Sequence, residues 1–195
     1  MFGGILLTHV HCSTCHSNKV KRHKLRKLKL AFPGDQKGTR FSVQSLIDFY
    51  CATELLTDNK MHFCGKCGGL REGVRVTCFE TTPQYLVVVM KNCKFDPKYD
   101  IEDKLMQSIS NNEIVNLRTK RSESDKRYTL YASLIHDHYY SLAKDSEKWY
   151  ISYEGKVTSQ DEEVQTADGS RAPCVLFYRR ADITEGITPT FDLQR

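Results

Sequence analysis

Two pairs of cysteines, each with two residues between its members, constrain this chain more than any other feature of its sequence. The pairs are Cys12–Cys15 and Cys64–Cys67, and residues 16–63 lie between them. Two intervening residues let both sulfurs of a pair face one point, and two such pairs complete the tetrahedral four-sulfur shell that Zn²⁺ prefers. The separation exceeds the roughly 15–20 residues of a compact zinc finger. We therefore expect each pair at the tip of a separate β-ribbon, with a larger fold bringing the tips together.

The zinc site predicted in this way is structural. Four protein ligands, Cys12, Cys15, Cys64 and Cys67, close the coordination shell and leave no position for a water nucleophile. Two unrelated pairs of free cysteines are the simplest alternative. A redox-active dithiol is disfavoured, because neither pair lies between a strand and a helix of a βαβ unit.

Length and composition suit one domain, or one large domain with a protruding subdomain, since the chain has 195 residues. No apolar stretch approaches the roughly 18 residues that cross a bilayer, so we expect no membrane partner. The first residues do not form a secretory signal. With eight cysteines, this predicts a reducing setting in the cytoplasm, the nucleus or both, where four thiolates bind zinc and four thiols stay free.

Much of the net charge of +5 is concentrated in one short segment. Its basic residues are Lys19, Lys21, Arg22, Lys24, Arg26, Lys27 and Lys29. The simplest interpretation is a strand with a solvated basic face, and the alternatives are nucleic-acid contact or a nuclear-import signal. The charge alone identifies no partner.

Hydrophobic periodicity predicts an α+β domain built on an antiparallel sheet. Ser42 is the expected N-cap of a helix that continues to about Leu56. Its expected apolar face consists of Leu46, Ile47, Phe49 and Tyr50. Residues 85–90 are continuously apolar, which predicts a strand buried on both faces. The other expected strands cover residues 5–11, 19–32, 74–79, 128–136, 138–142, 149–151 and 174–178.

A series of motifs, in chain order across about residues 2–180, resembles the ubiquitin-specific proteases. The motifs are Phe2-Gly3-Gly4 before the first cysteine pair, Thr82-Pro83-Gln84-Tyr85-Leu86 with Lys91, the run from Tyr128 to His136, His138-Tyr139, and Val175-Leu176-Phe177-Tyr178. The resemblance implies a papain-like cysteine protease fold of the USP type, with an antiparallel β palm and a zinc-ribbon β fingers extension. It places the fingers at about residues 2–80 and the palm at about residues 81–180. Residues 181–195 would form a disordered tail.

The resemblance also implies roles for particular side chains. The four paired cysteines would bind zinc in fingers that grip ubiquitin, and His138 would be the general base of the palm. The position of the third triad residue falls on Tyr153, which cannot take the hydrogen-bond acceptor role of Asp or Asn. The neighbouring Glu154 would orient the imidazole if the register shifts by one residue.

Two departures from the family pattern affect the expected activity. The family's nucleophilic cysteine lies on a thumb subdomain before the finger segment, and this chain begins after that point. None of the four other cysteines, Cys51, Cys78, Cys93 and Cys174, resembles this nucleophile. In addition, only Asp137 separates His136 from His138, so the loop that covers the ubiquitin tail is expected to be absent.

Three functions fit these observations. The first is the fingers-and-palm part of a deubiquitinase, a cysteine-type isopeptidase acting at the C-terminus of ubiquitin, which would be inactive as an isolated chain. The second is a binding module that keeps the grip on ubiquitin or ubiquitinated proteins and has lost catalysis. The third, less favoured, is a zinc-ribbon protein that binds nucleic acid through its basic strand.

Overall fold

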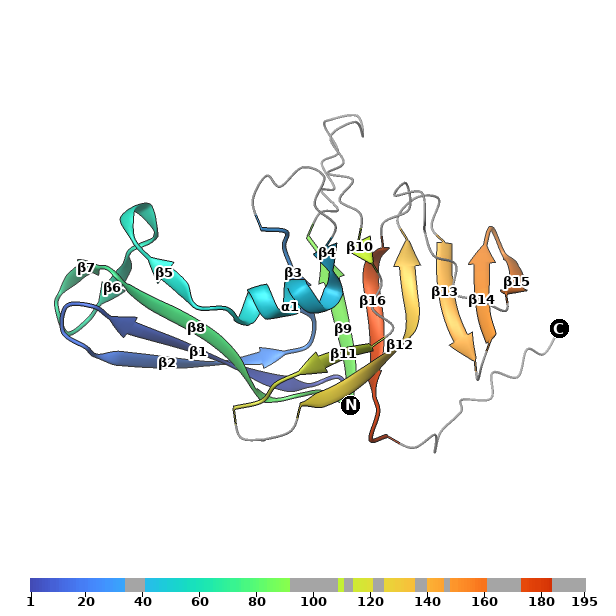
Figure 1. The fold of residues 1–195 in the computed structure, drawn as a ribbon, viewed down its shortest axis with the longest axis horizontal. Helices are drawn as coiled ribbons and strands as arrows, with labels where there is room; N and C mark the ends of the chain where they lie inside the picture. Colours follow the sequence, from blue (N-terminus) through green and yellow to red (C-terminus); the bar gives the residue numbers. More distant parts are fainter. Residues whose placement is uncertain are drawn as a thin grey trace, which may run out of the picture.

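The computed structural model describes residues 1–33, 41–91, 109–110, 114–120, 125–135, 140–145, 148–160 and 173–183. In this part of the chain, two main β-sheets are joined by an α-helix that contacts strands of both (Figure 1). The smaller sheet forms an elongated extension and the larger one forms the body of the molecule. The described part of the fold is mostly β, with antiparallel sheets and one α-helix, where the sequence predicted an α+β domain built on an antiparallel sheet.

The extension is a four-stranded antiparallel sheet in the order β2-β1-β8-β5. Its strands are β1 (Gly4–Cys12), β2 (Asn18–Leu25), β5 (Glu54–Leu56) and β8 (Gly73–Thr81). A separate two-stranded hairpin lies at its far end, formed by β6 (His62–Cys64) and β7 (Gly69–Arg71) after the short 3₁₀-helix η1 (Asp58–Lys60). The strands predicted at residues 5–11 and 74–79 are confirmed.

The body is a larger sheet in the order β15-β14-β13-β12-β16-β9-β3, with β11 pairing beside β12. Its strands are β3 (Leu28–Leu30), β9 (Tyr85–Met90), β11 (Ile114–Leu117), β12 (Lys126–Ile135), β13 (Tyr140–Asp145), β14 (Lys148–Tyr153), β15 (Lys156–Gln160) and β16 (Pro173–Arg180). Neighbours are antiparallel except β3 and β9, which are parallel. The short β4 (Phe41–Ser42) and β10 (Ile109–Ser110) form a parallel pair of their own.

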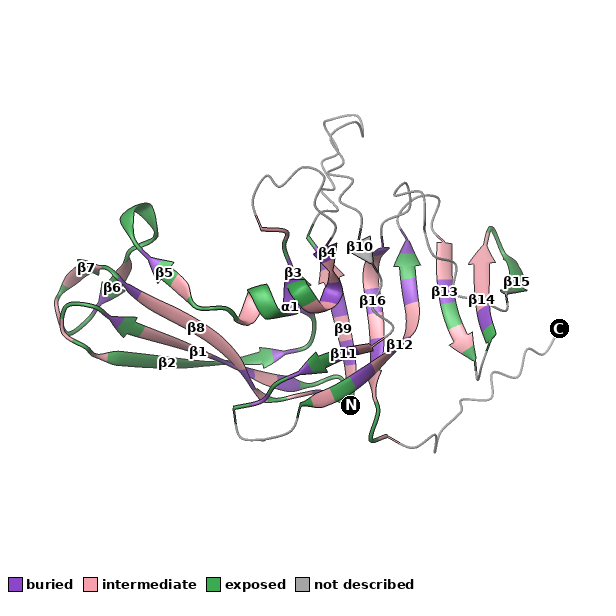
Figure 2. Ribbon diagram, viewed as in Figure 1, coloured by how far each residue is buried: buried purple, intermediate pink, exposed green. Residues whose placement is uncertain are grey.

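The hydrophobic core lies under the central strands of the body and continues into the near end of the extension. Leu86, Val88 and Met90 of β9 are fully buried, and β12, β16 and the helix contribute further side chains to the same cluster. The alternate residues of β9 are only half-buried. The prediction of a strand buried on both faces is therefore wrong: β9 buries one row of side chains and leaves the other partly open. Figure 2 shows β2 as largely exposed, whereas β8 of the same sheet is mostly half-buried.

The helix α1 (Val43–Cys51) begins at the predicted N-cap. The Ser42 hydroxyl accepts from the Ser45 backbone N–H, and the Ser45 hydroxyl accepts from the Ser42 N–H, each at 3.0 Å. The helix ends at Cys51 and not near Leu56 as predicted, because Glu54–Leu56 pair with β8 as an edge strand.

The apolar face of α1 also differs in part from the prediction. Its buried residues are Val43, Leu46 and Ile47, at the spacing of one helical stripe. Tyr50 packs partly buried against the core, whereas Phe49 is 54% exposed because it lies off this stripe. Leu46 and Ile47 are thus predicted correctly and Phe49 is not.

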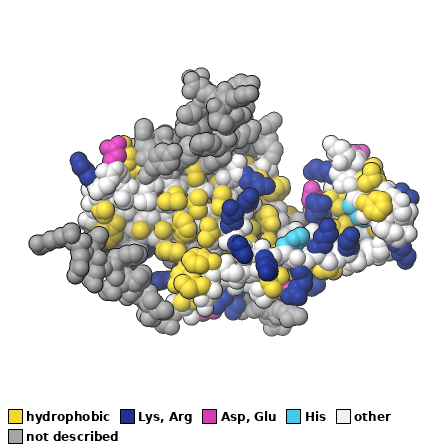
Figure 3. All heavy atoms as spheres, turned by 180° about the vertical axis from the view of Figure 1, so that it is seen from behind, with side chains coloured by type: hydrophobic (Ala, Val, Ile, Leu, Met, Phe, Trp, Pro, Cys, Tyr) yellow, Lys and Arg dark blue, Asp and Glu magenta, His cyan; other side chains and the backbone are white. Residues whose placement is uncertain are grey.

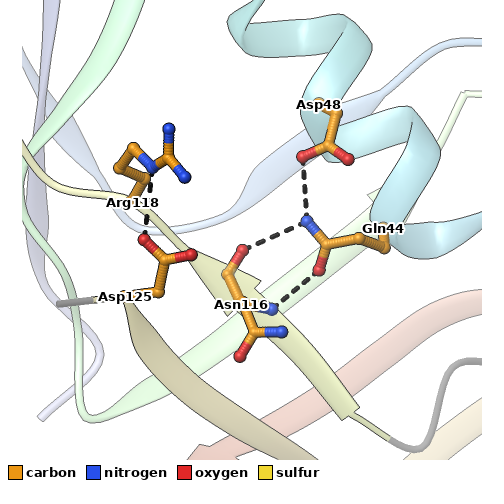
Figure 4. A network of polar contacts seen from close by, with 5 residues as sticks. All are labelled: Gln44, Asp48, Asn116, Arg118 and Asp125. Carbon is orange, nitrogen blue, oxygen red and sulfur yellow. Dashed lines mark hydrogen bonds and ion pairs between the residues drawn. The ribbon is translucent and has the colours of Figure 1, made fainter.

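A pair of hydrogen bonds ties α1 to the body (Figure 4). The Gln44 side chain accepts from the Asn116 backbone N–H at 2.7 Å and donates to the Asn116 carbonyl at 3.2 Å. Its amide also donates to Asp48 at 2.9 Å, which fixes its orientation. Gln44 thereby pairs with β11 as a neighbouring strand would, on the side of β11 away from β12.

The basic segment predicted as one strand over residues 19–32 forms two. β2 belongs to the extension and β3 to the body, with only Arg26 and Lys27 between them. The change of sheet follows from burial. Leu25, the last residue of β2, and Leu28, the first residue of β3, are both buried in the same hydrophobic core. Among the described residues, no helix is long and apolar enough to cross a membrane.

Candidate functional site

The four paired cysteines meet at the far end of the extension. Cys12 ends β1 and Cys15 lies in the turn to β2, while Cys64 ends β6 and Cys67 lies in the turn to β7. Their sulfur atoms all lie within 4.8 Å of one another. Cys12 and Cys64 are buried, and Cys15 and Cys67 are half-buried. The predicted meeting of two distant ribbons is therefore found.

The spacing of these sulfurs fits a zinc ion. With Zn–S distances of about 2.3 Å, a tetrahedron has S–S edges of about 3.8 Å. The Sγ atoms of Cys15 and Cys64 are 3.6 Å apart, and those of Cys12 and Cys67 are 4.0 Å apart. These distances lie on either side of the tetrahedral value, so the donor set can hold a tetrahedral metal ion.

A hydroxyl group that sequence reasoning missed lies against the sulfurs. Ser17 Oγ is 3.1 Å from Cys15 Sγ and 3.5 Å from Cys64 Sγ. The pKa of Cys64 is lowered to about 5, chiefly by its hydrogen bond with Ser17, and hydrogen bonding by Ser17 also lowers the pKa of Cys15. The pKa of Cys67 is raised to about 12, chiefly by its hydrogen bond with Cys15. Ser17 thus favours the thiolates that a metal requires; its position two residues after a paired cysteine is the signal that could have found it.

The backbone of both turns reverses at equivalent places. His16 follows Cys15 with φ 57°, and Gly68 follows Cys67 with φ 68°. In the first turn the His16 N–H donates to the Cys12 carbonyl at 3.0 Å. In the second turn Gly68 adopts this positive-φ conformation, which a glycine reaches without steric cost.

The two ribbons approach closely beside the sulfurs, at Gly73. A Cβ atom at this position would overlap the carbonyl oxygen of His11 and lie 2.8 Å from Cε1 of His62. His11 precedes a paired cysteine on one ribbon, and His62 lies two residues before one on the other. A glycine is therefore needed where β8 passes between the two halves of the site.

The predicted catalytic histidine lies outside the described residues. His138 falls in the gap 136–139, as does His136, and Cys93 lies in another gap. Tyr140, the first residue of β13, is the described residue nearest to His138 in sequence. The Tyr140 ring stacks on Tyr153 with the centroids 4.3 Å apart and 19° between the planes.

Glu154 occupies the turn between β14 and β15. It and Gly155 have φ values of 46° and 76°, as in a two-residue type I′ hairpin turn. The Glu154 side chain is exposed, and its hydrogen bond with the Tyr153 hydroxyl raises the pKa of Tyr153. The role of Glu154 in orienting His138 stays a prediction.

The other described cysteines lack the properties of an activated nucleophile, which requires a lowered pKa. Burial raises the pKa of Cys51 to about 11 and also raises the pKa of Cys78. Cys174 is disulfide-bonded, so the expectation of a free thiol is wrong at this position.

Comparison with known proteins agrees with the order of motifs. The sequence model of the family described as "Ubiquitin carboxyl-terminal hydrolase" matches residues 1–178. Ubiquitin carboxyl-terminal hydrolase 13 of Saccharomyces cerevisiae is 23% identical over 193 residues, which cover 92% of this chain and 25% of that protein. For ubiquitin carboxyl-terminal hydrolase Usp2 of Drosophila melanogaster, the identity is 24% over 190 residues, covering 92% of this chain and 20% of that protein.

Ubiquitin carboxyl-terminal hydrolase 16 of Arabidopsis thaliana is 22% identical over 192 residues, covering 94% of this chain and 18% of that protein. The chain thus spans a quarter or less of the length of these three curated relatives. The family match extends over nearly all of the described residues, from the first strand of the extension to β16 at the centre of the body. The chain therefore belongs to the ubiquitin carboxyl-terminal hydrolase family.

Proposed function

We propose that this chain is the fingers-and-palm part of a USP-type deubiquitinase domain, which hydrolyses isopeptide bonds at the C-terminus of ubiquitin. The family match over residues 1–178 supports the class of enzyme. The names of the relatives support a role on ubiquitin or ubiquitinated proteins. In this proposal the fingers cover about residues 2–80 and the palm about residues 81–180, while the thumb is supplied by sequence outside this chain. The protein would work in the cytoplasm, the nucleus or both.

The gathering of four sulfurs at the far end of the extension is the observation that carries this proposal. Their donor set suits Zn²⁺, which when bound would act structurally by holding the two turns together. The β6–β7 hairpin pairs with no strand of the four-stranded sheet among the described residues, so cross-linking by metal would fix its position. A rigid end to the extension is what a grip on a folded protein such as ubiquitin needs.

The proposed catalytic step involves His138 as general base. Its imidazole would take the proton of a cysteine thiol supplied from outside this chain and return it to the leaving amine. Glu154, or a group from elsewhere, would hold the imidazole in the correct orientation. Because the pKa of Cys51 is about 11 and that of Cys78 is also raised, neither is suited to replace the missing nucleophile.

Binding of ubiquitin to the complete chain of 195 residues tests the proposal. We expect calorimetry to detect binding, and Cys64→Ser to weaken it together with zinc content. Cys78→Ser is the matched control, since it removes a cysteine of the extension, on β8, that lies outside the metal site. Absence of ubiquitin binding by the zinc-loaded protein would refute the proposed grip.

A non-catalytic ubiquitin-binding module is the second candidate, favoured by the tyrosine at position 153, where the resemblance places the Asp or Asn of the triad. Both candidates predict that a ubiquitin probe with a C-terminal electrophile labels no cysteine of the isolated chain. They differ once an N-terminal segment carrying the family's nucleophile is joined to it, because only the deubiquitinase then hydrolyses a ubiquitin substrate in a His138-dependent manner. Labelling of Cys51 or Cys93 in the isolated chain would contradict the proposed absence of a nucleophile.

A further inference from the structure

The strand β2 has three properties that the proposed function does not use. It is the outermost strand of the extension, paired only with β1 among the described strands. It runs over Asn18–Leu25, whereas edge strands are usually kept short. All of its residues from Asn18 to Lys24 are exposed.

The charge on β2 projects to both faces of the sheet. Side chains alternate along a strand, which places Lys19, Lys21 and His23 on one face and Arg22 and Lys24 on the other. Arg22 forms an ion pair with Glu80 at 2.6 Å. Within the described part of the chain, the lysines of β2 have no ion-pair partner, so most of this charge is uncompensated.

The charge of β2 is part of a larger feature of the surface. Figure 3 shows Lys and Arg side chains gathered in a band along the extension, with few Asp or Glu side chains among them on this face. Beyond β2 the exposed Arg26 and Lys27 continue the charge toward the body. A partner at this edge would therefore meet positive potential along its length.

We propose that the outer edge of β2 binds an extended acidic segment of a polypeptide partner, which adds a further strand to the extension. An edge strand offers a row of unpaired backbone N–H and C=O groups, and a second strand satisfies both kinds of group. Acidic side chains of the added strand would lie opposite the basic rows on both faces, and opposite charges across neighbouring strands stabilise the pairing. This inference goes beyond the proposed function and does not depend on ubiquitin binding.

The geometry favours a polypeptide over a nucleic acid. A polyanion lying on one face of the sheet would reach only one of the two basic rows, whereas a strand in the plane of the sheet reaches both. Single-stranded nucleic acids bind to basic grooves that also stack the bases on aromatic rings. Residues 18–30 contain no aromatic side chain apart from the imidazole of His23.

The same charge disfavours other strands as partners. A second copy of β2 would bring lysines opposite lysines or arginines, and like charges directly opposite one another destabilise a pair of strands. Lysines on an edge also protect it from pairing with apolar strands. The outer edge of β2 therefore disfavours self-association and selects acidic sequences.

The test uses the complete, zinc-loaded chain and a fluorescein-labelled peptide as long as β2, made of Glu with Thr at every fourth position. We expect fluorescence anisotropy to show binding, and hydrogen exchange to slow at the amides of β2 that face away from β1. The double variant Lys21→Glu/Lys24→Glu, one change on each face, should weaken binding by about tenfold or more through lost cross-strand pairs. The matched control, Lys91→Glu/Lys156→Glu, changes two exposed lysines outside the extension and should bind as the unmodified protein does.

Two comparison ligands separate strand addition from simple charge attraction. A peptide of the same charge with Pro in place of Thr cannot complete the ladder and should bind at least about tenfold more weakly. A single-stranded DNA of the same charge should also bind more weakly. Equal binding of the Pro peptide, tighter binding of the DNA, or peptide binding without slower exchange in β2 would each overturn the proposal.

Discussion

The glycine at position 73 is required by the packing of its neighbours, since its φ is not in the left-handed region. Its Cα faces the carbonyl oxygen of His11 and the ring of His62, which belong to the two ribbons that carry the cysteines. The sequence gives no reason to single out this glycine. A close contact between distant segments leaves no local signal in the sequence.

Replacement of Gly73 by Ala should therefore destabilise the extension. Because the neighbouring backbone cannot move freely, we expect a loss of about 1–3 kcal/mol in the free energy of unfolding, as for other overpacked sites. Gly3→Ala is the control, since no atom lies within 4 Å of the Cβ that it would add. Urea denaturation of both variants measures the difference; equal stability would show that the ribbons can separate at no cost.

Ser17→Ala should make metal binding more sensitive to acid. The pKa of Cys64 is lowered to about 5, below the ordinary thiol value of 9.0, and the hydrogen bond with the Ser17 hydroxyl is the largest cause. Without this hydroxyl the pKa rises, protons compete better for the sulfur, and the midpoint of metal binding shifts to higher pH. Cobalt titrations followed by absorbance across a pH series check this. Ser13→Ala, in the same turn but exposed, should leave the midpoint unchanged.

At the scale of elements, α1 and β11 share the hydrophobic core, and a single side chain adds hydrogen bonds between them. Gln44 makes both hydrogen bonds to the backbone of Asn116. Gln44→Ala should cost about 1–3 kcal/mol of stability and speed hydrogen exchange at the Asn116 amide. Asp48→Ala removes one bond to the Gln44 side chain and leaves those two in place, so it should change exchange at this amide far less.

Local periodicity predicted most elements correctly and failed where tertiary pairing decides. The strands at residues 74–79 and 174–178 and the N-cap at Ser42 follow from patterns within a few residues, and the structure has all of them. The end of α1 and the division of residues 19–32 depend on which sheet each segment joins by strand pairing. No local pattern contains that information, because β5 becomes a strand by pairing with β8, and β3 by pairing with β9.

The candidate site shows the same limit. The four cysteines of the candidate metal site were predictable because their spacing is typical of a coordination shell. Ser17 and Gly73 were missed, since their importance comes from what lies beside them after folding. The proposed roles of His138 and Glu154 rest on the family pattern, and His138 lies outside the described residues.

For the whole molecule, the two sheets should respond differently to loss of metal. The far end of the extension has few buried apolar residues, whereas the core lies under the body. Removal of metal with a chelator should raise hydrogen exchange at the cysteine turns and in β6–β7, and leave exchange in β9, β12 and β16 nearly unchanged. Structural zinc contributes about 10–16 kcal/mol of apparent binding energy in small zinc domains, so the local effect should be large. A uniform increase across both sheets would contradict this separation.

The route of the chain between the sheets has a mechanical consequence. Only Arg26 and Lys27 separate β2 from β3, and only residues 82–84 separate β8 from β9. Both short crossings lead into adjacent strands of the body, since β3 pairs with β9. Neither crossing has the slack to absorb a displacement. A partner that displaces the extension therefore transmits force through the β3–β9 pair. The buried residues of those two strands receive this force directly.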